Sequence, residues 1–482
     1  MPKRLPAFMS ELPPAPAHHP VRKAIEKAAD AEVVAALNLF ASMPPSTAVL
    51  ANPVRYRHSV DCAGTPVELS IRSFGIRGCL LEEDIVSGAA DTFRVIFVGL
   101  FGRFASPAEH RALSRLLKQE LKLAIKNVLP TVARFMKAHP KATADTAIQY
   151  VAALRRATRE SKGIHRLRPP AELLLDLFRT HLEHVSVGAC SSAMRGRNAK
   201  DAKGVTALLQ DDPFQTVFSL LLRRKVNAVE AKILSNLGAI QIHHGSAGSN
   251  MVARYFASLH TRTTSDLFIA SQMALDCARH FGAISDLTDF VAELESAPAS
   301  RRDALIRDRA LKGSLPTFGH PEIAAAGRAN RVEVDPRPAI YLAPLFDAID
   351  KGELSVSANQ MKRVALVRRL YQFAFVEGIE KPGQPGRLRI APNTDFGAWI
   401  VQEILGVDPR DRTLLSYVFR GFGWMMDVRE QLQQSIIRPV ISPDPTIVPP
   451  PAEGGVIPQV IEKVHRRLSD SNSFSPRKKV AR

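Results

Sequence analysis

Residues 106–124, SPAEHRALSRLLKQELKLA, decide the fold class predicted for this chain. Ser106 and Glu109 form a capping-box pattern, and Pro107 occupies the first position of the predicted helix. The apolar residues that follow recur every three or four positions, as on one face of a helix. They are Leu113, Leu116, Leu117, Leu121 and Ala124. The stretch therefore predicts a long amphipathic helix.

Start and stop signals predict two more helices further along the chain. Ser300 and Asp303 mark the start of one, which Gly313 can end. Asn393 marks the start of another, which Gly406 can end. Glycine suits the position after a last helical turn because it adopts the left-handed backbone conformation without steric strain.

A further helix is predicted from Asp266 to about Arg279, with either Thr264 or Ser265 as its N-cap. Residues 67–71, VELSI, alternate apolar and polar side chains and are the candidate for a short strand. Val-rich strands do not alternate with the helices, which argues against a doubly wound sheet, and no solenoid-like repeat is visible. We therefore predict an all-α fold.

The length of 482 residues predicts more than one lobe, because a single core usually stops growing near about 250–300 residues. With 45% hydrophobic and 23% charged residues, the chain can form large cores. Prolines gather in residues 11–20 and 443–451, which favours extended chain. We expect residues 1–50 to be a basic, partly disordered extension and residues 443–482 a basic, disordered tail.

The formal net charge of +18 indicates anionic partners. Residues 1–28 carry +3 of this charge and residues 461–482 carry +5. The chain lacks zinc-finger spacing, an RNP-like strand and aromatic residues interleaved on a basic face. We therefore expect small anionic ligands rather than nucleic acid.

The cysteines predict neither a zinc ribbon nor a redox motif, because they form no CxxC pair. They are Cys62, Cys79, Cys190 and Cys277. This usage suits a reducing compartment. The most apolar segment, residues 95–102, is far shorter than the roughly 20 residues that span a bilayer. We expect a cytoplasmic protein with no metal site and no membrane segment, and the first residues show no targeting pattern.

Three clusters place a histidine beside a glycine at a predicted helix end, where a side chain can face a cleft. They are residues 242–250, IHHGSAGSN, residues 278–282, ARHFG, and residues 317–321, TFGHP. Each is weak when taken singly, because a lone histidine at a helix end more often bonds a backbone carbonyl or faces solvent.

The order of motifs along the chain is more specific. After the three clusters come residues 335–338, DPRP, residues 393–397, NTDFG, residues 419–424, FRGFGW, and residues 436–439, IIRP. This ordered series resembles the citrate synthase family, and the resemblance covers about residues 65–440. It implies a citrate synthase-like fold in which a small helical domain closes over a cleft in a large one.

The resemblance also implies domain boundaries and an assembly. The large domain would comprise residues 51–280 and 395–442, and the small domain residues 281–394. The protein would be a homodimeric acyltransferase of tricarboxylic acid metabolism. It would condense an acyl-CoA, either acetyl-CoA or a longer one, with oxaloacetate, and would release CoA together with citrate or an alkylcitrate. Acyl-CoA is then a substrate, and no cofactor is expected.

The resemblance assigns each site residue a role. Asp395 would remove a proton from the carbon next to the thioester carbonyl. His280 would hydrogen-bond that carbonyl, and His320 would protonate the ketone of oxaloacetate. The oxaloacetate would be held by His244, Arg337, Arg420 and the partner subunit's Arg438.

Elementary chemistry is consistent with these roles. The proton next to a thioester is too weakly acidic for a carboxylate to remove unaided, so a donor must stabilise the enolate oxygen as it forms. The planar fork of arginine matches the two oxygens of a carboxylate. One carboxylate, two histidines and three arginines therefore suit this condensation.

Two of the site residues also have a plainer interpretation. Asp395 can belong to a capping pattern with Asn393, and Arg337 can lie in a surface turn. Arg420 lies in an apolar helix without an obvious partner, and a bound anion would balance its buried charge. Gly421 beside it indicates either a close approach of another backbone or a kink.

The chain departs from the family pattern near two histidines. Gly245 and its neighbours follow His244 where the family has a glutamate, and Phe281 follows His280 where the family has glycine. The alternative hypothesis is therefore a catalytically degenerate paralogue that binds CoA or a partner protein. Arg328 and Arg331 either contact CoA phosphates or are solvated charges.

Overall fold

The computed structural model of this protein describes residues 92–101, 105–161, 170–195, 202–242, 248–259, 263–277, 282–319, 337–383 and 386–431. These residues belong to one of the two units into which the chain divides. The candidate strand at residues 67–71 and the two expected disordered ends lie outside the described residues. The division into a large and a small domain stays a prediction.

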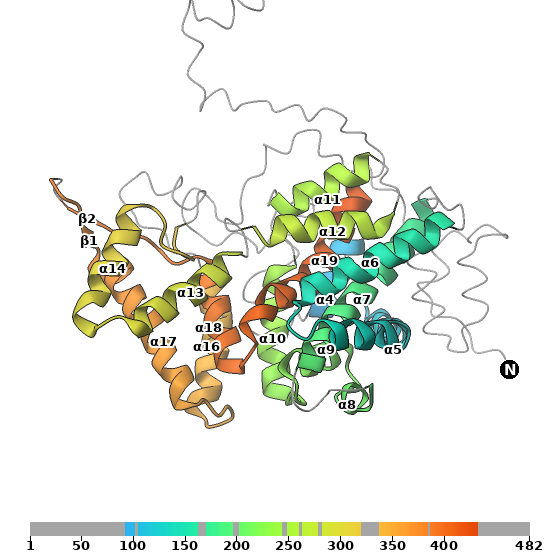
Figure 1. Ribbon diagram of the computed structural model, residues 1–482, viewed down its shortest axis with the longest axis horizontal. Coiled ribbons are helices and arrows are strands. Elements are labelled where there is room, and N and C mark those ends of the chain that lie inside the picture. The colour runs from blue at the N-terminus through green and yellow to red at the C-terminus, as the bar shows by residue number, and fades with distance from the viewer. Residues whose placement is uncertain are drawn as a thin grey trace, which may run out of the picture. The chain divides into compact units, whose positions relative to one another are not determined.

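The first half of the described chain consists of helices (Figure 1). They are α4 (Thr92–Phe101), α5 (Pro107–Ala138), α6 (Ala144–Ser161), α7 (Pro170–Arg195), α8 (Ala202–Ala207), α9 (Pro213–Leu222), α10 (Ala228–Gln241), α11 (Gly248–Ser258) and α12 (Thr264–Leu275).

Helices dominate the second half as well. They are α13 (Gly282–Ser296), α14 (Ala299–Leu311), α16 (Arg337–Asp350), α17 (Ala358–Tyr371), the π-helix η5 (Gln372–Glu377), α18 (Thr394–Leu405), the short 3-10 helix η6 (Pro409–Asp411) and α19 (Arg412–Gln431). Strands β1 (Ile379–Glu380) and β2 (Arg387–Leu388) form a small antiparallel ribbon in which Ile379 faces Leu388. The predicted all-α class is confirmed.

The capping box that opens α5 forms as predicted. The hydroxyl of Ser106 accepts from the backbone N–H of Glu109 at 3.3 Å, and the Glu109 carboxylate accepts from the backbone N–H of Ser106 at 2.8 Å. The predicted leucines of this helix are buried. Two orphan N–H groups are thus satisfied where the hydrophobic face begins.

Two other helix starts differ from prediction. The N-cap of α12 is Thr263, whose hydroxyl accepts from Asp266, rather than Thr264 or Ser265, and the helix ends at Leu275. Helix α14 follows Pro298, which offers no side-chain cap, so Ser300 lies inside it. Serine and threonine both cap helix N-termini, and the local backbone selects which of the neighbouring hydroxyl residues does so.

Helix α19 lies at the centre of the packing. Its residues 412–428 are all buried, and it contacts α4, α7, α10, α11, α12 and α13 (Figure 1). A helix buried on every side must satisfy each charged group it carries. Within the buried stretch those groups are Arg412, Arg420 and Asp427.

Buried ion pairs fix the start of α19. The Arg412 guanidinium pairs with Glu403 of α18 and donates to the Thr288 hydroxyl of α13 at 2.6 Å. Asp411, just before the helix, pairs with Arg195 at the end of α7 and accepts from Ser192 at 2.5 Å. The contacts with α13 and α7 join the start of α19 to helices from distant parts of the sequence.

Helix α18 packs with α13, α16 and α17. The indole N–H of Trp399 donates to Thr288 at 3.0 Å, and Arg363 of α17 pairs with Glu403 at 3.0 Å. Among the helices that the structure describes, none combines the length and apolar character needed to cross a membrane.

Candidate functional site

Two of the seven predicted site residues have described side chains, Asp395 and Arg420. Helix α16 begins at Arg337, but the side chain of this residue lies outside the described residues. So do the whole of His244, His280, His320 and Arg438.

Arg420 contacts a neighbouring amide in the interior. Its Nη1 donates to Oδ1 of Asn250, in the first turn of α11, at 2.9 Å. Nδ2 of Asn250 in turn donates to Oδ2 of Asp427 at 2.5 Å. The sequence offers no obvious partner for Arg420, and the structure provides one from a helix 170 residues earlier in the sequence.

Asp427 also pairs with Arg254, whose Nη2 lies 2.6 Å from Oδ1 of the aspartate. We call Asn250, Arg254, Arg420 and Asp427 the buried quartet. Asn250 and Asp427 are 0% exposed, and the two arginines are 2% exposed. Four polar side chains thus bond one another in a place that excludes water.

Sequence reasoning identified one member of the quartet and missed three. Asn250 and Arg254 are four residues apart on α11, and Arg420 and Asp427 are seven apart on α19. Both spacings place side chains on one helix face. A polar pair on one face of an otherwise apolar helix was the available signal.

Gly421 allows α19 to approach α7 closely. A Cβ at this position would lie well inside 3.0 Å of the His181 imidazole ring. Nε2 of His181 donates to the carbonyl oxygen of Val418 at 3.0 Å, so this nitrogen carries the proton. Burial lowers the pKa of His181 to about 4, which keeps the ring neutral. Gly421 thus makes room for an imidazole side chain, whereas the sequence suggested either the approach of another backbone or a kink.

Asp395 lies in the first turn of α18, as predicted. The N-cap is Asn393, whose Oδ1 accepts from the backbone N–H of Asp395 at 3.0 Å. This cap bond uses the Asp395 backbone and not its carboxylate. The positive end of the helix dipole favours a charged carboxylate here. Gly406 ends the helix in the left-handed conformation, also as predicted.

The segment that leads to residue 320 lies beside the start of α18. Gly319 donates from its backbone N–H to Ala391 at 2.8 Å, and Asn393 donates to the Thr317 carbonyl at 3.0 Å. Phe318 and Pro392 form an antiparallel bridge, and Nδ2 of Asn393 donates to the Gly319 carbonyl at 3.2 Å. Two predicted clusters, far apart in sequence, therefore meet.

Thr317 has an unusual conformation in this segment. Its φ is 64°, in the left-handed region that a β-branched residue rarely adopts. The side chain is buried, and its hydroxyl has no hydrogen-bond partner among the described residues. Such strain persists where surrounding structure fixes the backbone, often near functional sites.

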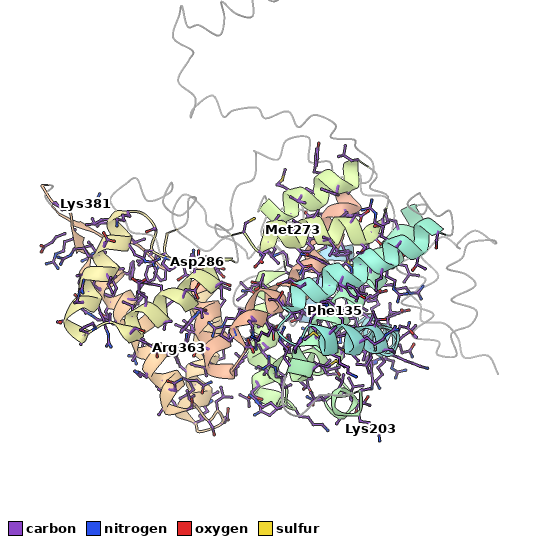
Figure 2. The ribbon with its side chains drawn as sticks, in the orientation of Figure 1. Phe135, Lys203, Met273, Asp286, Arg363 and Lys381 are labelled. Carbon is purple, nitrogen blue, oxygen red and sulfur yellow. The ribbon has the colours of Figure 1, made fainter. Side chains whose placement is uncertain are left out.

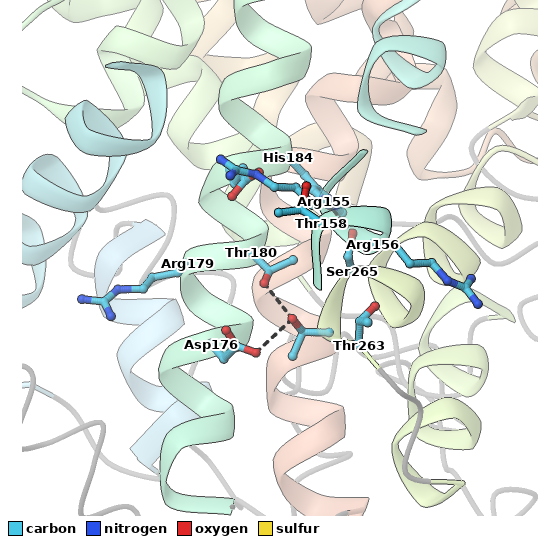
Figure 3. Close-up of a pocket in the computed structure, with 11 residues that line it drawn as sticks. Arg155, Arg156, Thr158, Asp176, Arg179, Thr180, His184, Thr263 and Ser265 are labelled. Atoms are coloured by element: carbon cyan, nitrogen blue, oxygen red, sulfur yellow. Dashed lines mark hydrogen bonds and ion pairs between the residues drawn. The ribbon is translucent and has the colours of Figure 1, made fainter. Parts of the chain in front are cut away.

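A cavity of about 340 Å³ lies among α6, α7 and the start of α12 (Figure 3). Its centre holds hydroxyl groups that bond one another and Asp176: Thr264 bonds Thr180 at 2.7 Å and Asp176 at 3.3 Å. The guanidinium groups of Arg156 and Arg179 point to opposite sides, away from these hydroxyls (Figure 3). The arginines therefore do not converge on a common anion, and no predicted site residue lines the cavity.

His184 also lines this cavity. Its Nε2 lies 2.9 Å from the Ser265 hydroxyl and its Nδ1 lies 3.0 Å from the Tyr417 hydroxyl. Burial lowers the pKa of His184 to about 3. The ring is neutral and joins α7 to α12 and α19. A base of such low pKa is poorly matched to proton transfer near neutral pH.

The described residues contain no group of three or more histidine, cysteine, aspartate or glutamate side chains arranged to hold a metal ion.

A family match decides the identity of the chain. The family described as "Citrate synthase, C-terminal domain" matches residues 76–440. The chain belongs to the citrate synthase family. The resemblance inferred from the ordered motifs is thus confirmed, and all seven predicted site residues fall inside the matched range.

Solved structures of citrate synthases share the fold of this chain. The citrate synthase from Thermoplasma acidophilum was solved as a ternary complex with carboxymethyl coenzyme A and oxaloacetate. It is 17% identical to this chain with a TM-score of 0.53, and the match covers 77% of this chain and 91% of that enzyme. The citrate synthase of Pyrobaculum aerophilum is 18% identical (TM-score 0.53, 77% and 88% covered), and that of Thermotoga maritima 15% identical (0.54, 77% and 89%). Likeness at this identity shows the shared fold. No curated protein matches the chain.

Proposed function

We propose that this protein condenses an acyl-CoA with oxaloacetate and releases free CoA together with citrate or an alkylcitrate. Membership of the citrate synthase family over residues 76–440 carries the proposal. The Thermoplasma acidophilum relative is a complex with a CoA derivative and oxaloacetate, which supports the same two substrates here.

Asp395 is the proposed base. It takes the proton from the carbon next to the thioester carbonyl, while His280 hydrogen-bonds the developing enolate oxygen. The new carbon–carbon bond forms at the ketone of oxaloacetate, whose oxygen His320 protonates. Water then cleaves the thioester and frees CoA. The bonds between Asn393 and the segment ending at Gly319 support this arrangement, because they hold the residue before His320 beside the helix of Asp395.

Arg420 is a proposed ligand of oxaloacetate, with His244, Arg337 and the partner subunit's Arg438. Its burial supports this role, because a guanidinium held away from water binds a carboxylate more strongly than an exposed one. Acetyl-, propionyl- and longer acyl-CoA are the candidate second substrates. An apolar pocket separates neighbours in this series by only about 1–3 kcal/mol.

Thiol release tests the reaction. Purified protein incubated with oxaloacetate and each acyl-CoA in turn should release free CoA, and the best acyl chain identifies the substrate. Asp395→Asn should lower the rate by about 10²- to 10⁴-fold, the usual contribution of a general base. Asp286→Asn on the exposed side of α13 is the matched control and should retain full rate (Figure 2).

A catalytically degenerate paralogue is the competing function, because the residues beside His244 and His280 depart from the family pattern. It predicts binding of CoA or oxaloacetate by calorimetry without thiol release from any acyl-CoA. That combination would replace the condensing enzyme with a binding protein.

We also propose that two copies form a homodimer through α11 and α12, which pack against each other. Large apolar side chains are exposed on or beside this pair: Met273 of α12 is 60% exposed (Figure 2). Tyr255 of α11 and Leu259, just after α11, are exposed as well. Sedimentation velocity should give a dimer that Met273→Glu converts to monomer. Met361→Glu, at an exposed methionine of α17, should not. A monomeric native protein would contradict the proposal.

A further inference from the structure

We propose that Asn250 and Asp427 are positioning residues for Arg420, which set the orientation in which its guanidinium meets a substrate carboxylate. This inference rests on the proposed function, since it assigns a task within the same oxaloacetate site. It concerns three buried residues that are linked through the amide of Asn250: Asn250, Arg420 and Asp427.

The chemistry of the partners fixes the orientation of the Asn250 amide. A guanidinium only donates hydrogen bonds, and an ionised carboxylate only accepts them. Oδ1 must therefore face Arg420, at 2.9 Å, and Nδ2 must face Asp427, at 2.5 Å. A rotated amide would place donor against donor and acceptor against acceptor, so one orientation is strongly favoured.

Asp427 is itself immobilised. It bonds Arg254, 2.6 Å away and on the same helix as Asn250. The chain of contacts runs from Arg254 through Asp427 and Asn250 to Arg420, and all four side chains are buried. Leaving any buried polar group without its partner costs about 1–3 kcal/mol or more, which makes the arrangement rigid.

A neutral amide suits this task better than a carboxylate would. Asn250 orients the guanidinium through a hydrogen bond without bringing a negative charge to it. An aspartate at position 250 would pair directly with Arg420 and would also lie against the carboxylate of Asp427, where like charges repel. The Asn250 amide therefore keeps the carboxylate of Asp427 apart from the guanidinium of Arg420. Because Asp427 fixes the amide, the amide in turn fixes the orientation of the guanidinium.

A double-mutant cycle tests the inference. The variants are Asn250→Ala, Arg420→Ala and the double variant, and the measurements are the oxaloacetate Kd by calorimetry and the KM values for oxaloacetate and acyl-CoA. We expect Asn250→Ala to raise the oxaloacetate Kd about 10-fold or more, which is the usual effect of losing a hydrogen bond to a charged group. The KM for acyl-CoA should change less than about twofold. In the Arg420→Ala background, Asn250→Ala should have almost no further effect.

A structural role alone would give a different pattern. It would lower the folded fraction and leave both KM values unchanged, or raise them together. Asn236→Ala, which removes another buried amide on α10, is the matched control and should leave the oxaloacetate Kd unchanged. If Asn250→Ala does not fold, Asn250→Ser or Asp427→Asn replaces it in the cycle.

The outcomes separate the two proposals. Equal effects of Asn250→Ala in both backgrounds would overturn the positioning role and leave the condensing function intact. A native protein that neither binds oxaloacetate nor releases thiol would overturn the proposed function, and the positioning role with it. A large effect that disappears in the Arg420→Ala background would support both.

Discussion

The amide of Asn393 donates to the backbone carbonyl of Gly319 at 3.2 Å while its oxygen caps the helix that carries Asp395. One side chain thus joins two segments 74 residues apart. The residue after Gly319 is His320, and His320 and Asp395 have proposed roles in different proton transfers of the same condensation. The Asn393 amide therefore adds a side-chain bond to the backbone contacts that already hold these two segments together.

Asn393→Asp should separate capping from this second bond. An aspartate caps helices as well as asparagine does, so the free energy of unfolding should change by less than about 1 kcal/mol. It cannot donate to Gly319, and we expect thiol release to fall by about 10-fold or more because the reacting groups lose alignment. Asn227→Asp, at the cap of α10, is the control. An unchanged rate in Asn393→Asp would show that the Gly319 bond does not matter to catalysis.

Arg420→Lys keeps the positive charge but loses the planar fork. We expect the oxaloacetate KM to rise about 10- to 100-fold, because hydrogen bonds to charged groups contribute about 1.5–3 kcal/mol each. Steady-state kinetics measure this change. Arg179→Lys, in a half-exposed ion pair with Glu120, should have almost no effect on the same KM. Equal KM values in native protein and Arg420→Lys would argue against carboxylate binding by this arginine.

Gly421→Ala should destabilise the fold. The added methyl group would collide with the buried ring of His181, and overpacking of this kind costs about 1–3 kcal/mol. Gly248→Ala is the matched control, since a Cβ there meets nothing within 4 Å. Urea unfolding of the two variants should separate them clearly. If Gly421→Ala is as stable as the native protein, the His181 ring of α7 does not lie against Gly421 of α19.

Thr317→Val should stabilise the protein. Valine is as strained as threonine at a φ of 64°, so the strain cancels in the comparison. The substitution replaces a buried hydroxyl that lacks a partner among the described residues, and we expect the free energy of unfolding to rise by about 1–3 kcal/mol. Thr317→Ser keeps the hydroxyl and should not be stabilised. A less stable Thr317→Val would indicate a bound water or ligand on this hydroxyl.

Acid should weaken the fold through two buried histidines. Burial lowers the pKa of His181 to about 4 and of His184 to about 3, from 6.5 in the unfolded chain. The unfolded state therefore binds more protons below pH 6.5, and the free energy of unfolding falls as the pH drops from about 6.5 toward 4. Asp145 acts in the opposite direction, because burial raises its pKa from 3.8 to about 6. The combined effect of the two histidines on the free energy of unfolding is larger than the opposite effect of Asp145.

Variants of these groups should change the slope of stability against pH in opposite directions. His184→Gln removes a histidine whose pKa is lowered and should flatten the slope between pH 6.5 and 4. Asp145→Asn removes the opposing group and should steepen it. His139→Gln, at the exposed end of α5, is the control. Thermal unfolding across this pH range measures all three, and a slope that His184→Gln leaves unaltered would contradict the buried neutral ring.

Local features of the fold were predictable because their causes lie within a few residues. The capping box of Ser106 and Glu109, the N-cap Asn393 and the C-cap Gly406 each involve only one turn of helix. The N-cap of α12 was predicted at Thr264 or Ser265 and lies at Thr263. The prediction missed it because all three side chains carry a hydroxyl that can cap a helix.

The contacts of the candidate site were not predictable in this way. Asn250 reaches Arg420 across 170 residues, and nothing next to either residue indicates the other. Helical spacing could have suggested that Asp427 shares a face with Arg420, but the partner helix follows only from packing. The order of the motifs along the chain predicted the site residues, and the contacts of these residues follow from the fold.

The central place of α19 has a consequence for synthesis of the chain on the ribosome. Helices α7, α10, α11 and α12 all bury side chains against α19, which is made after every one of them. Their inner faces must stay uncovered until about residue 431 has left the exit tunnel. This core therefore forms late in biosynthesis. Until it forms, the helices already synthesised expose apolar surface that a chaperone would bind.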